Sequence, residues 1–158
     1  MKKIQLLFLV LFFVGSVTWA AAPDPTDQLK PFLDRVVTEL KATDFQQDSV
    51  QNQRQRIITL ASEHFDFHEM SKRVMGRSWR KLSAAEQEQF VSLFSQLLER
   101  VYIGQVDDYL DKNIEFINQR IRDDRAEVKT LFVDSNKTIP VSYIVLLKGD
   151  KWMAYDIV

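Results

Sequence analysis

The spacing of apolar residues changes once along this chain, near Asn113, from a helical period to a strand period. Up to that point apolar residues recur every three or four positions, as they do on one face of a helix. Beyond it apolar and polar residues alternate, as they do along a strand with one buried face. Helices followed by a run of strands predict an α+β fold, with four N-terminal helices packed on a four-stranded antiparallel sheet.

Capping residues and breaks in the apolar pattern indicate where the helices begin and end. Asp66 with Glu69, and Ser83 with Glu86, have the spacing of capping boxes. Pro31 fits the first helix only if it lies in the first turn. The expected helices span about residues 26–42, 49–65, 66–76 and 83–110, with a polar break over residues 43–47 between the first two.

Short polar turns separate the strands expected in the second part of the chain. The expected strands span about residues 115–122, 125–133, 139–147 and 152–158. In the first of them, Phe116 and Ile117 are expected on opposite faces, with the alternation unbroken to Arg122. In the third, Val141 and Tyr143 are expected to share a face.

The N-terminus has the three parts of a secretory signal peptide. Lys2 and Lys3 precede an uncharged apolar run, Ile4–Val14, and small residues follow it. We expect cleavage after Ala20, with cleavage after Ala22 as the alternative. An uncleaved membrane anchor is disfavoured, because the run is shorter than the ~20 apolar residues that a membrane span needs. The expected parts are a signal peptide over residues 1–20 and a single domain over residues 21–158.

The absence of cysteine limits both chemistry and location. It excludes disulfides, thiolate metal sites and the lipid-modified cysteine of a bacterial lipoprotein. We therefore expect an exported, unlipidated and soluble protein. Loss of the signal peptide would remove two lysines from a chain whose formal net charge is −1. That balance argues against nucleic acid binding, which needs a strongly basic face.

Few residues suggest catalysis or metal binding. His64 and His68 are four residues apart, but a helix cap at Asp66 would place a break between them. The acidic residues over 107–111 lack the glycine and terminal glutamate of a calcium loop. No Gly-x-Ser-x-Gly motif is present, and period 2 places the pair Tyr155–Asp156 on opposite faces. We therefore expect no metal, no cofactor and no enzymatic activity.

The remaining signals are a basic cluster and a large set of apolar and aromatic residues. Arg73, Arg77, Arg80 and Lys81 suit either a solvated surface or a contact with an anionic headgroup or membrane partner. The apolar residues suit either a filled core or the wall of a pocket, which periodicity cannot distinguish. The residue pattern alone therefore predicts an exported α+β domain and leaves its ligand open.

A motif in the third expected helix resembles the MlaC family, also called the toluene-tolerance family. Residues 65–80 read Phe-Asp-Phe-His-Glu-Met-Ser-Lys-Arg-Val-Met-Gly-Arg-Ser-Trp-Arg. The resemblance continues through residues 86–102, the segment Pro140–Tyr143 and the segment Trp152–Asp156. Each piece alone is weak, but their order and spacing together cover nearly the whole expected mature chain.

The resemblance implies a soluble periplasmic carrier of phospholipid with a curved sheet and an NTF2-like fold. The implied partners are an outer-membrane lipoprotein–porin complex and an inner-membrane ABC transporter with a substrate-binding ring. The implied role is maintenance of outer-membrane lipid asymmetry, by a monomer. Family members are expected to continue past Asp156, so we expect the C-terminal elements to be missing from this sequence. The alternatives are a periplasmic non-lipid interaction module, or an NTF2-like enzyme acting on a small apolar substrate.

The pattern and the resemblance together give candidate site residues. Those expected to line an acyl-chain pocket are Phe67, Met70, Val74, Phe94, Leu98, Val101, Tyr102, Val141, Tyr143, Val145, Trp152 and Tyr155. The residues expected to contact the headgroup or a partner are Arg73, Arg77 and Arg80.

Overall fold

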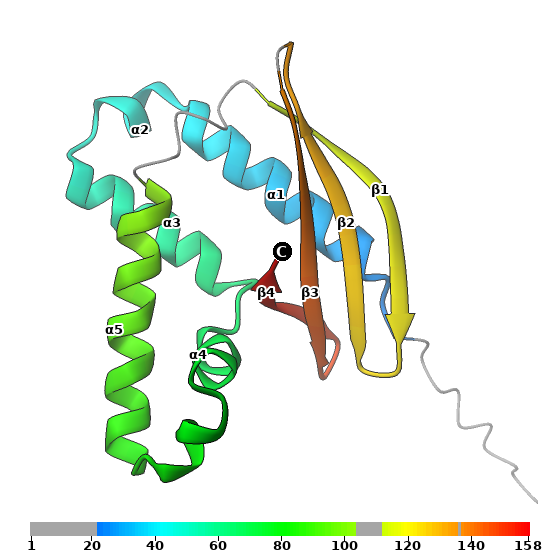
Figure 1. Cartoon of the computed structure of the whole chain (residues 1–158). Coiled ribbons are helices and arrows are strands. Elements are labelled where there is room, and N and C mark those ends of the chain that lie inside the picture. The colour runs from blue at the N-terminus through cyan, green and yellow to red at the C-terminus, as the bar shows by residue number, and fades with distance from the viewer. Residues whose placement is uncertain (1–21, 104–111, 136) are drawn as a thin grey trace, which may run out of the picture.

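The computed structural model describes residues 22–103, 112–135 and 137–158. Helices come first along the chain and strands follow (Figure 1). The helical elements are α1 (Pro25–Lys41), α2 (Thr43–Gln47), α3 (Val50–Ser62), α4 (Phe67–Met75), the 3₁₀ helix η1 (Gly76–Lys81) and α5 (Ala84–Ile103). The strands are β1 (Asn113–Arg122), β2 (Arg125–Val133), β3 (Thr138–Lys148) and β4 (Lys151–Ile157).

The strands form one antiparallel sheet in the order β1-β2-β3-β4. Figure 1 shows a curved sheet with α1 lying diagonally across it and α5 lying farthest from it. The expected α+β fold is confirmed. The residues expected to form a polar break instead form the short helix α2, and the end expected for the last helix lies outside the described residues.

Helix α1 is the element that joins the helical part to the sheet. The Asp24 side chain caps it by accepting hydrogen bonds from the N–H groups of Thr26 (2.8 Å) and Asp27 (3.1 Å). Pro31 lies inside α1 and not in its first turn as expected. Its lack of an N–H disfavours that position, and α1 continues through it with Leu29, Phe32 and Leu33 buried against the sheet.

The core lies between α1 and the inner face of β2, β3 and β4. Val128 is fully buried at 0% exposure, and Val145 is 2% exposed. The inward residues of β2 alternate as predicted, from Ala126 to Phe132. The core cluster comprises Leu29, Phe32, Leu33, Ala126, Val128, Tyr143, Val145, Trp152 and Ala154.

Two β-bulges break the alternation that the sequence pattern predicts. In β1, Phe116 pairs with Thr130 and Asn118 pairs with Lys129, so Ile117 is an extra residue. Phe116 therefore faces inward before the bulge, and Gln119 faces inward after it. The Gln119 side chain accepts a hydrogen bond from Thr26 Oγ1 at 2.6 Å. In β4, a second irregularity lies at Tyr155, after which Ile157 faces inward.

The connection between α3 and α4 is fixed to strand β4 by backbone hydrogen bonds. The Asp66 N–H donates to the Ala154 carbonyl (2.7 Å), and the Ala154 N–H donates to the His64 carbonyl (2.7 Å). The Asp66 carboxylate accepts from the Glu69 N–H at 3.0 Å, which confirms the predicted cap, and forms an ion pair with Lys148. Burial would raise the pKa of Asp66, but the Lys148 ammonium and the Glu69 N–H hold it below its ordinary value.

Candidate functional site

A cavity of about 260 Å³ lies between the inner face of the sheet and the helices. Its wall comes from α1, α3, α4 with the connection that precedes it, α5 and the sheet. The lining residues are Phe32, Leu33, Val36, Val37, Leu40, Ile57, Ile58, Ala61, Phe65, Phe67, Met70, Leu98, Glu99, Ile114, Phe132, Val141, Tyr143 and Ile157.

Helical spacing explains how the α1 and α3 walls of the cavity form. On α1, Phe32, Val36 and Leu40 are four residues apart and therefore share one face. On α3, Ile57 and Ala61 have the same spacing. No described side chain of α3 or α5 is fully buried. The apolar faces of these two helices thus meet a hollow where a filled core would bury them.

The chemistry of the wall is almost entirely apolar. Glu99 is the single charged residue among the lining residues described, and it is half-buried on α5. Within the described part of the chain, no cluster of histidine and acidic residues could hold a metal ion. Such a wall offers burial without fixed polar partners, which suits a flexible apolar chain better than a polar substrate.

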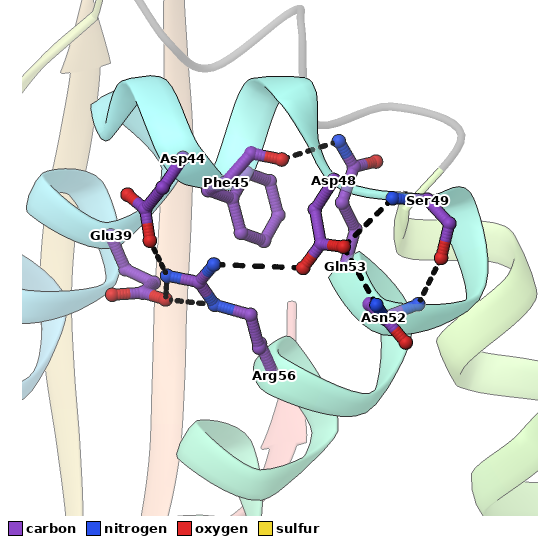
Figure 2. Close-up of polar contacts among 8 residues, drawn as sticks. All are labelled: Glu39, Asp44, Phe45, Asp48, Ser49, Asn52, Gln53 and Arg56. Atoms are coloured by element: carbon purple, nitrogen blue, oxygen red, sulfur yellow. Dashed lines mark hydrogen bonds and ion pairs between the residues drawn. The ribbon is translucent and has the colours of Figure 1, made fainter.

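Arg56, on α3, lies among acidic residues of α1 and of α2 with its C-terminal cap (Figure 2). Arg56 Nε donates to Glu39 (2.6 Å), one terminal nitrogen of Arg56 donates to Asp44 (3.1 Å), and the other lies 3.7 Å from Asp48. The Arg56 guanidinium also lies over the Phe45 ring, 5.3 Å from its centroid. Arg56 therefore links α3 to α1 through Glu39 and to α2 and its C-terminal cap through Asp44 and Asp48.

The structure brings five of the expected pocket residues into the cavity wall. Phe67 and Met70 come from α4, Leu98 comes from α5, and Val141 and Tyr143 come from β3. These residues belong to elements far apart in sequence, so the wall exists only in the folded chain.

Other expected pocket residues are not among the lining residues. Val74 and Val101 lie on the surface, with 64% and 47% exposure, because each lies beyond the part of its helix that faces the hollow. Phe94 stacks on Phe90, with ring centroids 5.9 Å apart, between the cavity and the N-terminal end of α5. The side chain of Tyr102 lies outside the described residues.

Three further expected pocket residues on the sheet serve the core instead. Val145 and Trp152 belong to the close-packed cluster under α1, and the Trp152 indole N–H donates to the Pro23 carbonyl at 2.6 Å. Tyr155 occupies the β4 bulge and is covered by the Arg73 guanidinium, which lies 4.0 Å from its ring centroid. All three side chains are therefore buried by other residues of the protein and do not face the cavity.

The arginines expected to contact a headgroup lie outside the cavity wall. Arg73 lies 3.8 Å from Glu69 in addition to covering Tyr155. Arg77 and Arg80 are exposed on η1.

The two histidines point to different neighbours. His64 stacks on Phe32 with ring centroids 4.3 Å apart, and His68 meets Trp79 edge-on at 5.2 Å. Burial, together with the nearby Lys151 and Arg35 charges, lowers the pKa of His64 from its ordinary value. Both histidines therefore have aromatic contacts and neither lines the cavity.

Sequence reasoning missed the contribution of α1 and α3 to the wall. The helical spacing of Val36, Val37 and Leu40, and that of Ile57, predicted only an apolar helix face, and Ile58 was not among the expected residues. Their helical spacing indicated an apolar face, but it does not indicate whether that face packs against the sheet or lines a hollow.

Comparisons with known proteins place the chain in a family. The family model described as MlaC protein matches residues 30–158. Among solved structures, a phospholipid-binding protein from Ralstonia solanacearum, determined in complex with a phospholipid, has a TM-score of 0.77 and 22% identity, covering 85% of this chain and 77% of that chain. That likeness shows the fold.

No curated protein sequence matches this chain. Of the described helices, none is long and apolar enough to cross a membrane. Because the family match spans most of its length, the chain belongs to the MlaC protein family.

Proposed function

We propose that this protein binds a phospholipid with its acyl chains in the cavity and carries it through the periplasm. The observation that carries the proposal is the apolar hollow between α1, α3, α5 and the sheet. Its structural neighbour was determined with a phospholipid bound, which supports the same ligand class here. The wall supports carriage better than catalysis, because it is apolar apart from Glu99 among the lining residues described.

The energetics of lipid transfer favour such a wall. Each buried methylene contributes about 0.8 kcal/mol, so a diacyl lipid with roughly 30 methylenes gains on the order of 20 kcal/mol gross. A soluble carrier must offer comparable burial, because the lipid would otherwise remain in the membrane. Aromatic and aliphatic side chains provide burial that tolerates acyl chains of different lengths.

The loose packing of α3 and α5 supports a cavity whose walls move when lipid enters. Its volume of about 260 Å³ exceeds the roughly 150 Å³ of an engineered cavity that binds benzene. The helices α3 and α5 contact one another and bury none of their described side chains fully, so their displacement from the sheet requires little repacking. We infer that loading separates this pair from the sheet and release lets it return.

Export is proposed from the N-terminal sequence, and the partners are proposed from the family. We propose export through a signal peptide over residues 1–20, cleaved after Ala20 or Ala22, and a mature domain that begins there. The carrier would exchange lipid with an outer-membrane lipoprotein–porin complex and with an inner-membrane ABC transporter. Exchange between these complexes would maintain the lipid asymmetry of the outer membrane.

The test compares two adjacent leucines on α5. Leu98 lines the cavity, whereas Leu97 is 56% exposed and does not. We expect Leu98→Asp to abolish the phospholipid adduct seen by native mass spectrometry of protein purified from periplasm. Leu97→Asp introduces the same charge one residue away and should retain the adduct.

Thermal unfolding of both variants shows whether each is folded. If Leu98→Asp does not fold, Leu98→Trp fills the hollow without a charge and serves in its place. Equal adduct levels in the folded Leu98 and Leu97 variants, or a wild-type protein free of lipid, would contradict the proposed site.

A further inference from the structure

The end of α4 and the following 3₁₀ helix form a strongly basic surface, which we call the basic platform. It consists of Lys72, Arg73, Arg77, Arg80 and Lys81, all of them exposed. Five cations fall within ten residues of a chain whose formal net charge is −1. Positive charge is therefore concentrated on this surface and is not a property of the whole molecule.

Ion pairing within the protein neutralises little of this charge. Lys72 lies 3.0 Å from Glu69, and Arg73 lies 3.8 Å from the same carboxylate. Among the described residues, Arg77, Arg80 and Lys81 form no ion pair with an acidic side chain. Three cations of the basic platform thus remain available to an external anion.

The platform is held firmly by the helices beneath it. Trp79, in the middle of η1, is 6% exposed and contacts the Phe90 ring edge-on at 6.3 Å. Gln87 Nε2 donates to the Trp79 carbonyl (3.1 Å) and the Leu82 carbonyl (3.3 Å). Gly76, at φ +54°, provides the left-handed turn between α4 and η1. Anchoring of Trp79 fixes the backbone that carries Arg77, Arg80 and Lys81.

One exposed apolar residue lies among these cations. Val74 is 64% exposed and lies between Arg73 and Arg77 in the sequence. Phe67, Met70 and Val74 are spaced at i, i+3 and i+7, so they share one face of α4. The face of α4 that lines the cavity at Phe67 and Met70 therefore continues to the surface at Val74.

We propose that the basic platform docks the protein on an anionic phospholipid membrane, with Val74 entering the interfacial layer. Clustered Lys and Arg side chains around an exposed apolar residue are the features that bind anionic lipid surfaces. A membrane is favoured over an acidic protein because the platform's apolar face is continuous with the cavity wall. Docking here would bring one wall of the cavity to the lipid surface. The inference goes beyond the proposed function, since lipid binding needs only the cavity.

The experiment measures co-sedimentation of the exported wild-type protein with vesicles. One set contains phosphatidylcholine alone, and the other also contains phosphatidylglycerol. We expect binding only to the anionic vesicles, and weaker binding as salt is raised. The triple variant Arg77→Glu, Arg80→Glu, Lys81→Glu should reduce that binding by about tenfold or more. Val74→Asp should reduce it by a smaller factor.

The matched control applies the same charge change elsewhere. Arg120, Arg122 and Lys137 are exposed and lie on the sheet side of the molecule. Their triple change to Glu should leave vesicle binding near wild type. If the platform triple fails to fold, Arg77→Gln with Arg80→Gln replaces it.

An equal loss of vesicle binding in the two triple variants would overturn the proposal. Wild-type binding that is the same with and without phosphatidylglycerol would also overturn it. Absence of vesicle binding together with a platform-dependent complex with an acidic protein would assign the surface to that protein instead. The lipid adduct of the platform variant, measured by native mass spectrometry, reports separately on the cavity.

Discussion

The two halves of the cavity wall differ in how they are packed. The sheet and α1 contain the close-packed core, where Val128 and Val145 are inaccessible to water. The helices α3 and α5 bury no described side chain fully, although both carry a clear apolar face. In Figure 1 these two helices lie on the left of the molecule, and β1–β3 lie on the right. One half of the wall is therefore built like a protein interior and the other half is not.

This difference shows where a ligand is needed. A helix with a wide apolar face gains stability by burying that face. On α5, Leu93 and Leu97 remain more than half exposed, and the inner residue Leu98 faces the hollow. A bound acyl chain would supply the missing contacts to α3 and α5 while adding little to the sheet. We therefore expect stability and dynamics to respond to lipid in the helical half and not in the sheet.

The largest expected contrast comes from truncating one leucine in each half of the lipid-free protein. Leu29 is 4% exposed in the core, so Leu29→Ala should lower the free energy of unfolding by about 3 kcal/mol, through lost transfer energy and a new cavity. Leu98 already borders a hollow, so Leu98→Ala should cost about 1 kcal/mol. Urea unfolding monitored by circular dichroism measures both. Equal costs would mean that α5 is packed as tightly as α1.

A smaller and local effect is expected from removing the lipid. Binding to the folded state stabilises the segments that contact the ligand. We expect amide hydrogen exchange in α3 and α5 to accelerate by about tenfold or more after delipidation. Exchange in β2 and β3, measured by mass spectrometry in the same samples, should change little. Uniform acceleration in all elements would show that lipid stabilises the fold as a single unit.

The order of elements could be predicted from sequence because it depends on local periodicity. The strand ranges, the Asp66 cap and the Ser83–Glu86 capping box follow from spacing alone, and the structure contains them. The bulge at Ile117 could not be predicted, because it is determined by pairing with β2. Its consequence is large, since it reverses which residues of β1 face inward beyond Ile117.

The division between core and cavity wall was likewise beyond the sequence pattern. Tyr143 and Val145 share one face of β3 and both belong to the core cluster, yet only Tyr143 also lines the hollow. Their separation depends on where α1 crosses the sheet, which is a tertiary property. Val101 illustrates the same limit on α5, where an apolar position that fits the pattern lies on the surface.

The smallest expected effect tests the border between the two halves, where His64 of the α3–α4 connection stacks on Phe32 of α1. Burial and the Lys151 and Arg35 charges hold the pKa of His64 below its ordinary value of 6.5, against a weaker opposite influence of Glu63. The unfolded chain therefore binds a proton at His64 more readily than the folded chain does. Stability must then fall as pH decreases from 6.5 toward the folded pKa.

Replacing His64 with Phe removes this proton and retains the stacking on Phe32. We expect His64→Phe to flatten the decline of the unfolding free energy between pH 7 and pH 5, with an effect smaller than that of Leu98→Ala. His68, which contacts Trp79 instead, provides the matched control through His68→Phe. If both variants flatten the decline equally, the pH response does not originate at the His64–Phe32 contact. If only His64→Phe flattens the decline, an uncharged His64 imidazole stabilises the contact between the α3–α4 connection and α1.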